Sequence, residues 1–346
     1  MALLEVKNVD IHYKTEKGTL HAISNISFKI EEGERLGLVG ESGCGKTTMA
    51  KALMMLLPDN GFIPKGQILF KGEDLVQKSK EEIRKLRWKD ISMIAQSAMN
   101  ALNPVYRVGD QLMEAMLAHS SMSKEDARHR AGELFELVGL ERKRLRDYPH
   151  QMSGGMKQRA IIAMALALNP ALIIADEPTT ALDVVVQDRI LNKIIQIQRE
   201  INSSMVFITH DISVVSETCN TIIVMYGGKI MEKASTRQFF KNPYHPYSLG
   251  LQNAFPSLLD MGEELISIPG SPPNLLEPKP GCYFQERCPF ATDRCREEAP
   301  ELHQVEEEHS VACHYIDEVE RFRAEAKKRE SWDMVRDRLI AARTEG

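Results

Sequence analysis

The sequence lacks any apolar run long enough to cross a bilayer. Its longest run, AIIAMALAL (160–168), is half the length of the about 18 residues that a membrane-spanning helix needs. The opening MALLEVKNVDIHY has no basic segment followed by an apolar stretch and a small-residue cleavage site, so we find no export signal. These absences argue against a membrane-spanning protein, and we expect the chain to stay in the cytoplasm.

The sequence also lacks an excess of basic charge. Its 44 lysines and arginines against 49 aspartates and glutamates give a net charge of −5, with no basic stripe. Nucleic acid is therefore not an expected partner. Hydrophobic residues make up 43% of the chain and charged residues 27%, as in folded soluble proteins. Because 346 residues exceed what one ordinary core supports, we expect two or three domains.

Cysteine is scarce and unevenly placed. Of six cysteines, Cys44 and Cys219 lie in stretches where they act as small apolar fillers, and four fall within 32 residues. These four are Cys282, Cys288, Cys295 and Cys313. Clustered thiols in a reduced compartment usually hold metal rather than form disulfides. Intervals of five, six and seventeen residues favour an iron–sulfur cluster over zinc, which prefers close pairs.

Two alternatives to the cluster stay open. One is zinc, with His309 and His314 as substitute ligands, and the other is a set of unliganded cysteines.

The first chemical motif follows three predicted strands. Alternating residues 3–13 and 21–30 predict two strands of an antiparallel layer, and a third, apolar strand leads into GESGCGKT (40–47). This motif has the phosphate-loop pattern of a glycine, four residues and Gly-Lys-Thr, followed by a helix that Pro58 is expected to end. The alternative is a tight turn with a solvated lysine.

A phosphate loop predicts specific contacts to a nucleotide. Backbone N–H groups of the glycine turn and of the helix start would face the phosphates. Lys46 would reach the β- and γ-phosphate oxygens, and the hydroxyl of Thr47 would hold Mg²⁺.

An acidic pair supplies the second element that a phosphate loop needs. ALIIADEP (171–178) reads as a buried parallel strand that ends in Asp176 and Glu177. Asp176 would join the magnesium shell, and Glu177 would orient or deprotonate the attacking water. The alternative is a surface acid pair that caps the following helix.

His210 ends another apolar strand, VFITH, at the edge where ligands bind in open α/β sheets. A lone histidine at such a position is usually structural.

A second helix start with glycines lies between the loop and the acids. In QMSGGMKQRAIIAMALALNP (151–170), Ser153 is positioned to cap an apolar-periodic helix, and such a start is itself an anion site. Two phosphate-binding helix starts are unusual for a single nucleotide.

Together these residues resemble the ATP-binding subunits of ABC transporters, along the whole chain. The resemblance implies an α/β phosphate-loop ATPase core with an antiparallel β layer, a helical insertion subdomain and a small C-terminal extension. The family signature LSGGQ appears as MSGGM, with Met156 in place of glutamine. In the family two nucleotide-binding domains pack head to tail. Ser153, Gly154 and Gly155 would then contact the ATP held by the partner subunit.

The resemblance also implies roles for single residues. Gln96 is similar to the family's glutamine lid and magnesium ligand, Asp183 to its inter-subunit loop, and His210 to its γ-phosphate switch. Tyr13 resembles the aromatic residue that stacks on adenine, although an aromatic at a strand edge is more often packing. The implied catalytic residues are Glu177, His210, Gln96 and Lys46. The implied nucleotide contacts comprise Tyr13, Gly40, Ser42, Gly43, Cys44, Gly45, Lys46, Thr47, Thr48, Gln96, Asp176, Ser153, Gly154, Gly155 and Asp183, and the implied magnesium ligands are Thr47, Gln96 and Asp176.

The expected organisation follows from the same resemblance. Residues 1–96 and 166–240 would form the core, 97–165 the helical subdomain with the signature, and 241–346 the extension with the four cysteines. The helical subdomain would meet two transmembrane permease subunits, and a related but different ATPase subunit would complete a heterodimer. An extracytoplasmic substrate-binding protein would act indirectly, and the chain would sit peripherally on the cytoplasmic face of the membrane.

The C-terminal third narrows the resemblance. Residues 242–258 and the proline-rich 267–282 resemble the extension of importers of di- and oligopeptides, nickel and oligosaccharides, several of which carry a [4Fe–4S] cluster there. Peptides are the leading cargo. One rival function is a soluble ABC ATPase of DNA repair or translation. Such proteins usually have a coiled-coil insertion or a tandem core, and neither appears in this sequence. Another rival function is a metal or redox sensor.

The last segment, 316–343, predicts a surface helix with an apolar stripe on its own domain, or a partner-binding helix.

Overall fold

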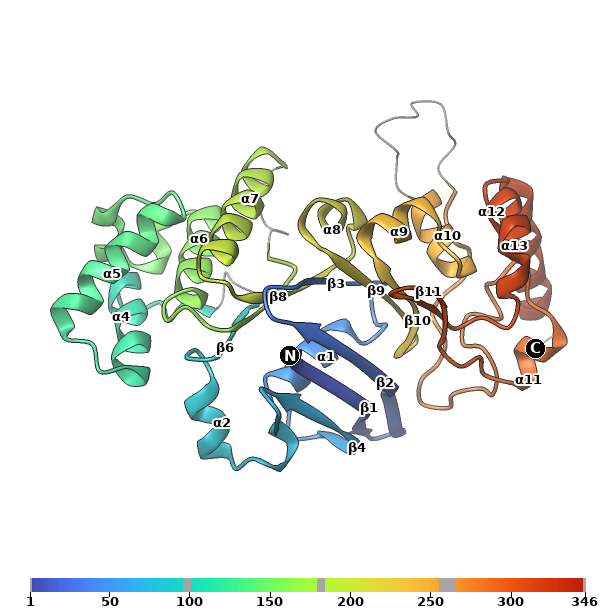
Figure 1. Cartoon of the computed structure of the whole chain (residues 1–346), viewed down its shortest axis with the longest axis horizontal. Coiled ribbons are helices and arrows are strands. Elements are labelled where there is room, and N and C mark those ends of the chain that lie inside the picture. Colours follow the sequence, from blue (N-terminus) through green and yellow to red (C-terminus); the bar gives the residue numbers. More distant parts are fainter. Residues whose placement is uncertain (1, 96–100, 179–183, 255–265, 345–346) are drawn as a thin grey trace.

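Two sheets and three groups of helices make up the protein (Figure 1). The computed structural model describes residues 2–95, 101–178, 184–254 and 266–344. Within this part of the chain, no helix combines the length and the apolar character that a membrane span requires.

The larger sheet has a parallel centre, as the continuous apolar strands predict. Strands β6, β7, β8, β3 and β9 pair in parallel, and β10, β12 and β11 continue the sheet in antiparallel pairs. Their bounds, from one edge to the other, are β11 (His303–Glu306), β12 (His309–Val311), β10 (Lys229–Ser235), β9 (Thr221–Tyr226), β3 (Arg35–Val39), β8 (Ser204–Thr209), β7 (Leu172–Asp176) and β6 (Ile91–Ile94).

The smaller sheet is the antiparallel layer expected from residues 3–13 and 21–30. Its strands lie in the order β2 (Gly18–Glu31), β1 (Ala2–Thr15), β4 (Gly61–Phe70) and β5 (Glu73–Asp74). The layer packs with one face of the large sheet around α1 (Lys46–Leu53) in a single apolar cluster. The opposite face of the large sheet belongs to a second cluster, so the central strands are buried on both sides.

Helices flank the large sheet at both ends. Those of the helical insertion, α4, α5 and α6, pack together at one end of the molecule, and α12 and α13 lie at the other (Figure 1). The remaining helical bounds are α2 (Lys80–Leu86), α4 (Val108–His119), α5 (Lys124–Leu137), α6 (Gly154–Ala165), α7 (Val184–Glu200), α8 (Ile212–Thr218), α9 (Thr236–Lys241), α10 (Pro246–Asn253), α11 (Asp293–Glu297), α12 (Val319–Ala326) and α13 (Arg329–Thr344). These layers confirm the predicted α/β core with an antiparallel layer, a helical insertion and a C-terminal extension.

Two helix predictions need correction. Helix α1 ends at Leu53, before Pro58, and Met55 takes a left-handed φ of 49°. The Arg87 guanidinium donates hydrogen bonds to the carbonyls of Met54 and Met55 and so satisfies this helix end without proline. Residues 316–343 form two helices, α12 and α13, rather than one; their apolar stripe does pack on the chain's own core.

The C-terminal extension is continuous with the large sheet. Strand β12 pairs with β10, with Glu232 opposite Val311 and Lys233 opposite Ser310. Tyr247, Phe284 and Trp332 from the extension share one apolar cluster with the central strands. The extension therefore packs on the edge of the ATPase core and is not a separate domain joined only by a linker.

Candidate active site

The phosphate loop lies between β3 and α1, where the glycines of the motif allow a tight path. Gly40 has φ 147°, and a Cβ atom there would lie 2.2 Å from the Met225 carbonyl oxygen. Only glycine fits at such an approach. Gly45 caps α1 in the left-handed region, while Ser42 and Gly43 face solvent. The loop therefore presents its backbone outward at the start of a helix, which is an anion-binding arrangement.

Lys46 is held inside this loop. Its ammonium donates to the carbonyls of Gly40 at 2.7 Å and Glu41 at 2.9 Å, and the residue is only 7% exposed. The Cys44 sulfur lies 3.5 Å from the same ammonium. Burial raises the pKa of the Cys44 thiol above its usual value, so this cysteine acts as a neutral apolar filler.

Thr47 and Asp176 meet across the sheet edge. The Thr47 hydroxyl lies 3.4 Å from a carboxylate oxygen of Asp176, which ends β7 and is buried. Burial raises the pKa of Asp176, and the hydrogen bond from Thr47 opposes this shift. A buried carboxylate beside a hydroxyl offers the hard oxygen ligands that Mg²⁺ prefers.

Glu177 and His210 form a second pair at this edge. The Nδ1 atom of His210 lies 2.9 Å from the Glu177 carboxylate, whereas the two residues are 33 positions apart in sequence. Glu177 takes a left-handed φ of 49°, and its N–H donates to the Ile208 carbonyl at 2.8 Å. A non-glycine residue in this region is strained, and such strain is concentrated at functional sites.

The other predicted nucleotide contacts lie at two places in the described part of the chain, beside α1 and at the start of α6. The Tyr13 hydroxyl lies 3.2 Å from that of Thr48 on α1, and its ring packs against Gly61. Ser153 caps α6 by accepting a hydrogen bond from the Met156 N–H, so Gly154 and Gly155 form the first turn. Within the described residues, no hydrogen bond links the signature residues to the phosphate loop. Gln96 and Asp183 lie outside the described residues.

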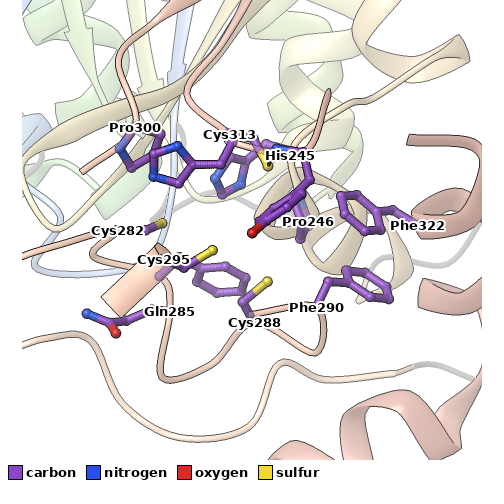
Figure 2. A pocket seen from close by; sticks show the side chains of 13 residues that line it. His245, Pro246, Cys282, Gln285, Cys288, Phe290, Cys295, Pro300, Cys313 and Phe322 are labelled. Atoms are coloured by element: carbon purple, nitrogen blue, oxygen red, sulfur yellow. Dashed lines mark hydrogen bonds between the residues drawn. The ribbon is translucent and has the colours of Figure 1, made fainter. Parts of the chain in front are cut away.

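The four C-terminal cysteines line one pocket (Figure 2). Cys282 ends the proline-rich segment, Cys288 lies in the loop that follows it, Cys295 lies on α11, and Cys313 lies in the residues after β12. The Cys282 N–H donates to the Cys295 carbonyl at 2.7 Å. This approach depends on Gly281, because a Cβ atom there would lie 2.3 Å from the same carbonyl.

Burial disfavours the charged form of three thiols in this pocket. Burial raises the pKa of Cys282 to about 12 and that of Cys313 to about 11, and it raises the pKa of Cys288 well above its usual value. Neighbouring thiols of the pocket add to each of these shifts. A metal that binds here would have to displace these protons.

The pocket does not have the geometry of a single-ion site. Among the described residues, no three His, Cys, Asp or Glu side chains converge on one metal position. Zinc needs its sulfurs about 2.3 Å from one ion, so the arrangement does not fit it. In a [4Fe–4S] cluster each cysteine binds a different iron, so the sulfurs need only surround a common space.

The two histidines named as substitute ligands have other partners. His309 is buried outside the cysteine pocket, with Nε2 2.7 Å from a Glu232 carboxylate oxygen. His314 lines the pocket, yet its Nε2 lies 2.9 Å from the Glu298 carbonyl. Neither arrangement favours a mixed cysteine and histidine site.

One contact at the phosphate loop was not predicted from the sequence. Arg287, which directly precedes Cys288, donates to both carboxylate oxygens of Glu41, at 2.6 and 2.9 Å. Glu41 occupies a position that the motif leaves free, and Arg287 is 246 residues away. No pattern in the sequence indicates it, because Arg287 is an ordinary arginine inside a cysteine-rich segment.

Comparisons with known proteins agree with this geometry. Residues 23–180 match the family described as ABC transporter, and residues 231–295 match the oligopeptide/dipeptide transporter C-terminal region. The chain is 46% identical to the oligopeptide transport ATP-binding protein OppD of Escherichia coli (strain K12), over 86% of this chain and 89% of that protein. It is 45% identical to the dipeptide transport ATP-binding protein DppD of Lactococcus lactis subsp. cremoris, over 91% of each.

A solved structure supports the same fold. The dimeric ATP-binding cassette MJ0796, in a post-hydrolysis state with ADP and phosphate, is 30% identical and superimposes with a TM-score of 0.62. The match covers 68% of this chain and 99% of that one. The phosphate loop, the acids beside it and these relationships lead to one conclusion: the chain belongs to the ABC ATPase family, as a member of its group of oligopeptide and dipeptide transport ATP-binding proteins.

Proposed function

We propose that this chain hydrolyses ATP to drive the import of di- or oligopeptides, as one of two ATPase subunits of a membrane importer. The proposal depends on one observation, that a phosphate loop, Asp176 and Glu177 share a sheet edge in a chain with a peptide-transporter C-terminal region. Both relatives described above are named for peptide transport. Nickel or oligosaccharide import, or a soluble non-transport ATPase, are the alternatives.

The phosphate loop binds the triphosphate in this proposal. The backbone of residues 40–45 and the start of α1 supply N–H donors, and the ammonium of Lys46 takes up phosphate charge. Tyr13 stacks on the adenine ring and Thr48 holds its hydroxyl in place.

The acidic edge performs the hydrolysis. Thr47, Asp176 and Gln96 would hold Mg²⁺, and the ion would supply charge neutralisation at the phosphate oxygens. Glu177 accepts the proton of the attacking water, and its left-handed backbone aims the carboxylate at that water. His210 orients Glu177 through their hydrogen bond and contacts the γ-phosphate.

A second ATPase subunit completes each site. Ser153, Gly154 and Gly155 form an exposed helix start that can serve a nucleotide held by a partner, and Asp183 acts at the same junction. The partner in this proposal is a related but different subunit, so that the pair is a heterodimer. ATP favours the closed pair and hydrolysis reopens it.

The helical subdomain, residues 97–165, is the docking surface for two permease subunits. Val105 and Tyr106 are 71% and 57% exposed beside α4, as expected for residues that a partner covers. Residues 1–96 and 166–240 form the ATPase core, and 241–346 form the extension. In this proposal the chain sits on the cytoplasmic face of the membrane, and an extracytoplasmic substrate-binding protein delivers the cargo.

The extension holds a [4Fe–4S] cluster in this proposal, through Cys282, Cys288, Cys295 and Cys313. The support is that all four thiols line one pocket. The cluster would fix the loop and α11 in one arrangement. Transport chemistry needs no electron carrier, so its role is structural or regulatory.

Metal and sulfide analysis tests the cluster. We expect about four iron and four sulfide per chain in anaerobically purified protein, with a broad visible absorbance band. One zinc without sulfide, or no metal at all, would contradict the proposal. A Cys313→Ser variant should lose the iron, whereas Cys219→Ser, outside the pocket, should keep it.

Uptake by cells tests the transport function. Deletion of this chain should abolish uptake of labelled di- and oligopeptides, and the wild-type chain should restore it. The Glu177→Gln variant should not restore it. Normal peptide uptake together with lost nickel or oligosaccharide uptake would favour another cargo, and no change in any uptake would favour a soluble ATPase.

A further inference from the structure

The C-terminal extension reaches the phosphate loop through one arginine. Arg287 donates from Nη1 and Nη2 to the two carboxylate oxygens of Glu41, at 2.6 and 2.9 Å. The Arg287 side chain is 4% exposed and that of Glu41 is 26% exposed. A two-pronged, charge-assisted contact that is shielded from water is both strong and directional.

Arg287 is fixed before it meets the loop. Its Nε donates to the Pro269 carbonyl at 2.8 Å, Nη2 to the Ile268 carbonyl at 3.3 Å, and Nη1 to the Tyr226 hydroxyl at 3.2 Å. These acceptors belong to the extension and to β9. The guanidinium is therefore a rigid anchor whose position is set by the C-terminal part of the fold.

Glu41 connects Arg287 to Lys46, because it contacts both side chains. Its N–H donates to the Tyr247 hydroxyl at 2.8 Å, and its carbonyl accepts from the Lys46 ammonium at 2.9 Å. Arg287 and Tyr247, both from the extension, thus hold the side chain and the backbone of Glu41. The residue that they hold is in turn a direct contact of the lysine.

We propose that Arg287 is a positioning residue for ATP binding, which aligns the phosphate loop through Glu41. The proposal rests on the assignment of residues 40–47 as the nucleotide site. A misplaced contact of about 1 Å can cost about a hundredfold in an enzyme, so loss of this anchor should weaken ATP binding markedly.

Arg287 also connects the nucleotide site to the cysteine pocket. It directly precedes Cys288, and Arg338 donates to the carbonyls of both Glu286 and Cys288, at 2.9 and 3.1 Å. The backbone that carries the anchor is therefore the backbone that carries a pocket thiol.

Affinity for Mg·ATP in the full-length chain, measured with a fluorescent ATP analogue, tests this role. We expect Arg287→Ala to weaken binding by about tenfold to a hundredfold, within the range of typical couplings between sites. Arg287→Lys should recover part of the affinity, because lysine keeps the charge but not the two-pronged contact. Arg294→Ala is the matched control, since Arg294 directly precedes Cys295 but pairs only with the exposed Glu298.

A double-mutant cycle separates positioning from loss of fold. Glu41→Ala combined with Arg287→Ala leaves no unpaired buried charge and should bind no worse than the weaker single variant, since the two residues act as one unit. Additive effects, or a folded Arg287→Ala chain with wild-type affinity, would overturn the proposal. The Lys46→Ala variant distinguishes failure of the positioning role from failure of the nucleotide-site assignment. If Lys46→Ala also binds ATP normally, the nucleotide site itself is wrongly assigned.

Discussion

Glu177, the proposed catalytic base, is a residue at which the backbone leaves its usual conformation. Its left-handed φ of 49° follows directly after the buried strand β7, and its N–H is held by the Ile208 carbonyl of β8. The neighbouring Asp176 keeps an extended, buried position on β7. The change of conformation between two adjacent acids aims their carboxylates at different tasks, one toward Thr47 and one toward His210.

Replacing Glu177 by glutamine should separate binding from hydrolysis. The amide keeps the shape of the side chain but cannot accept a proton from water, so turnover should fall by about a hundredfold or more. ATP affinity should stay near that of the wild type. Phosphate release and nucleotide binding measured on the same preparation check this, and near-normal hydrolysis would remove Glu177 from the mechanism.

Replacing Lys46 by alanine should remove binding instead. The ammonium sits between the Gly40 and Glu41 carbonyls at the start of α1, and no other lysine of the helix is buried. Affinity for ATP should fall strongly while the fold is kept. Lys51→Ala, an exposed lysine on the same helix, is the control and should bind ATP normally.

At the scale of elements, the extension is attached to the core by strand β12. This strand lies beside β10 and places His309 against Glu232, both with fully buried side chains. Glu232 also accepts hydrogen bonds from the backbone N–H groups of Tyr244 and His245, both at 2.9 Å. One buried carboxylate therefore ties together β10, β12 and the chain that leads into α10.

Removing this histidine should loosen the attachment. His309→Ala leaves the buried carboxylate of Glu232 short of one partner, and such a loss of a buried hydrogen bond costs about 1–3 kcal/mol in the free energy of unfolding. Urea unfolding monitored by circular dichroism measures it. His303→Ala, on the exposed face of β11, should change the free energy of unfolding by less than about 1 kcal/mol. Equal stabilities of the two variants would show that the pair does not secure β12.

The same element scale shows what the sequence could predict. The phosphate loop, the acids and His210 were predictable because each follows an apolar strand, and parallel strands end at one edge. The helical insertion was predictable from its periodicity. The contact between Glu41 and Arg287 was not, because no local pattern relates residues 246 positions apart. The early end of α1 was missed for the same reason, since it depends on Arg87 from beyond β4.

At the scale of the whole molecule, the ATPase core and the extension share one interior. A single apolar cluster contains Phe135 of the helical subdomain, Tyr226 of the central sheet, and Tyr247 and Trp332 of the extension. Trp332 also donates from its ring N–H to the Ala326 carbonyl at 2.8 Å. The boundary proposed at residue 240 therefore separates segments of the sequence, but it does not separate the hydrophobic core, which contains residues from both sides.

Truncation after residue 240 should consequently abolish folding. It would remove Tyr247, Phe284, Phe322 and Trp332 from the cluster, and loss of each such aromatic side chain costs about 3–5 kcal/mol. The sum, about 12–20 kcal/mol, is comparable to or larger than the about 5–15 kcal/mol that stabilise a typical domain. The edge of β10 would also lose its partner β12. We expect an insoluble or unfolded fragment by solubility and circular dichroism, whereas truncation after residue 341 should fold normally. A soluble fragment of residues 1–240 with a cooperative unfolding transition and ATP binding would show that the extension is an independent module. In that case the contact between Arg287 and Glu41 would be dispensable for the shape of the loop.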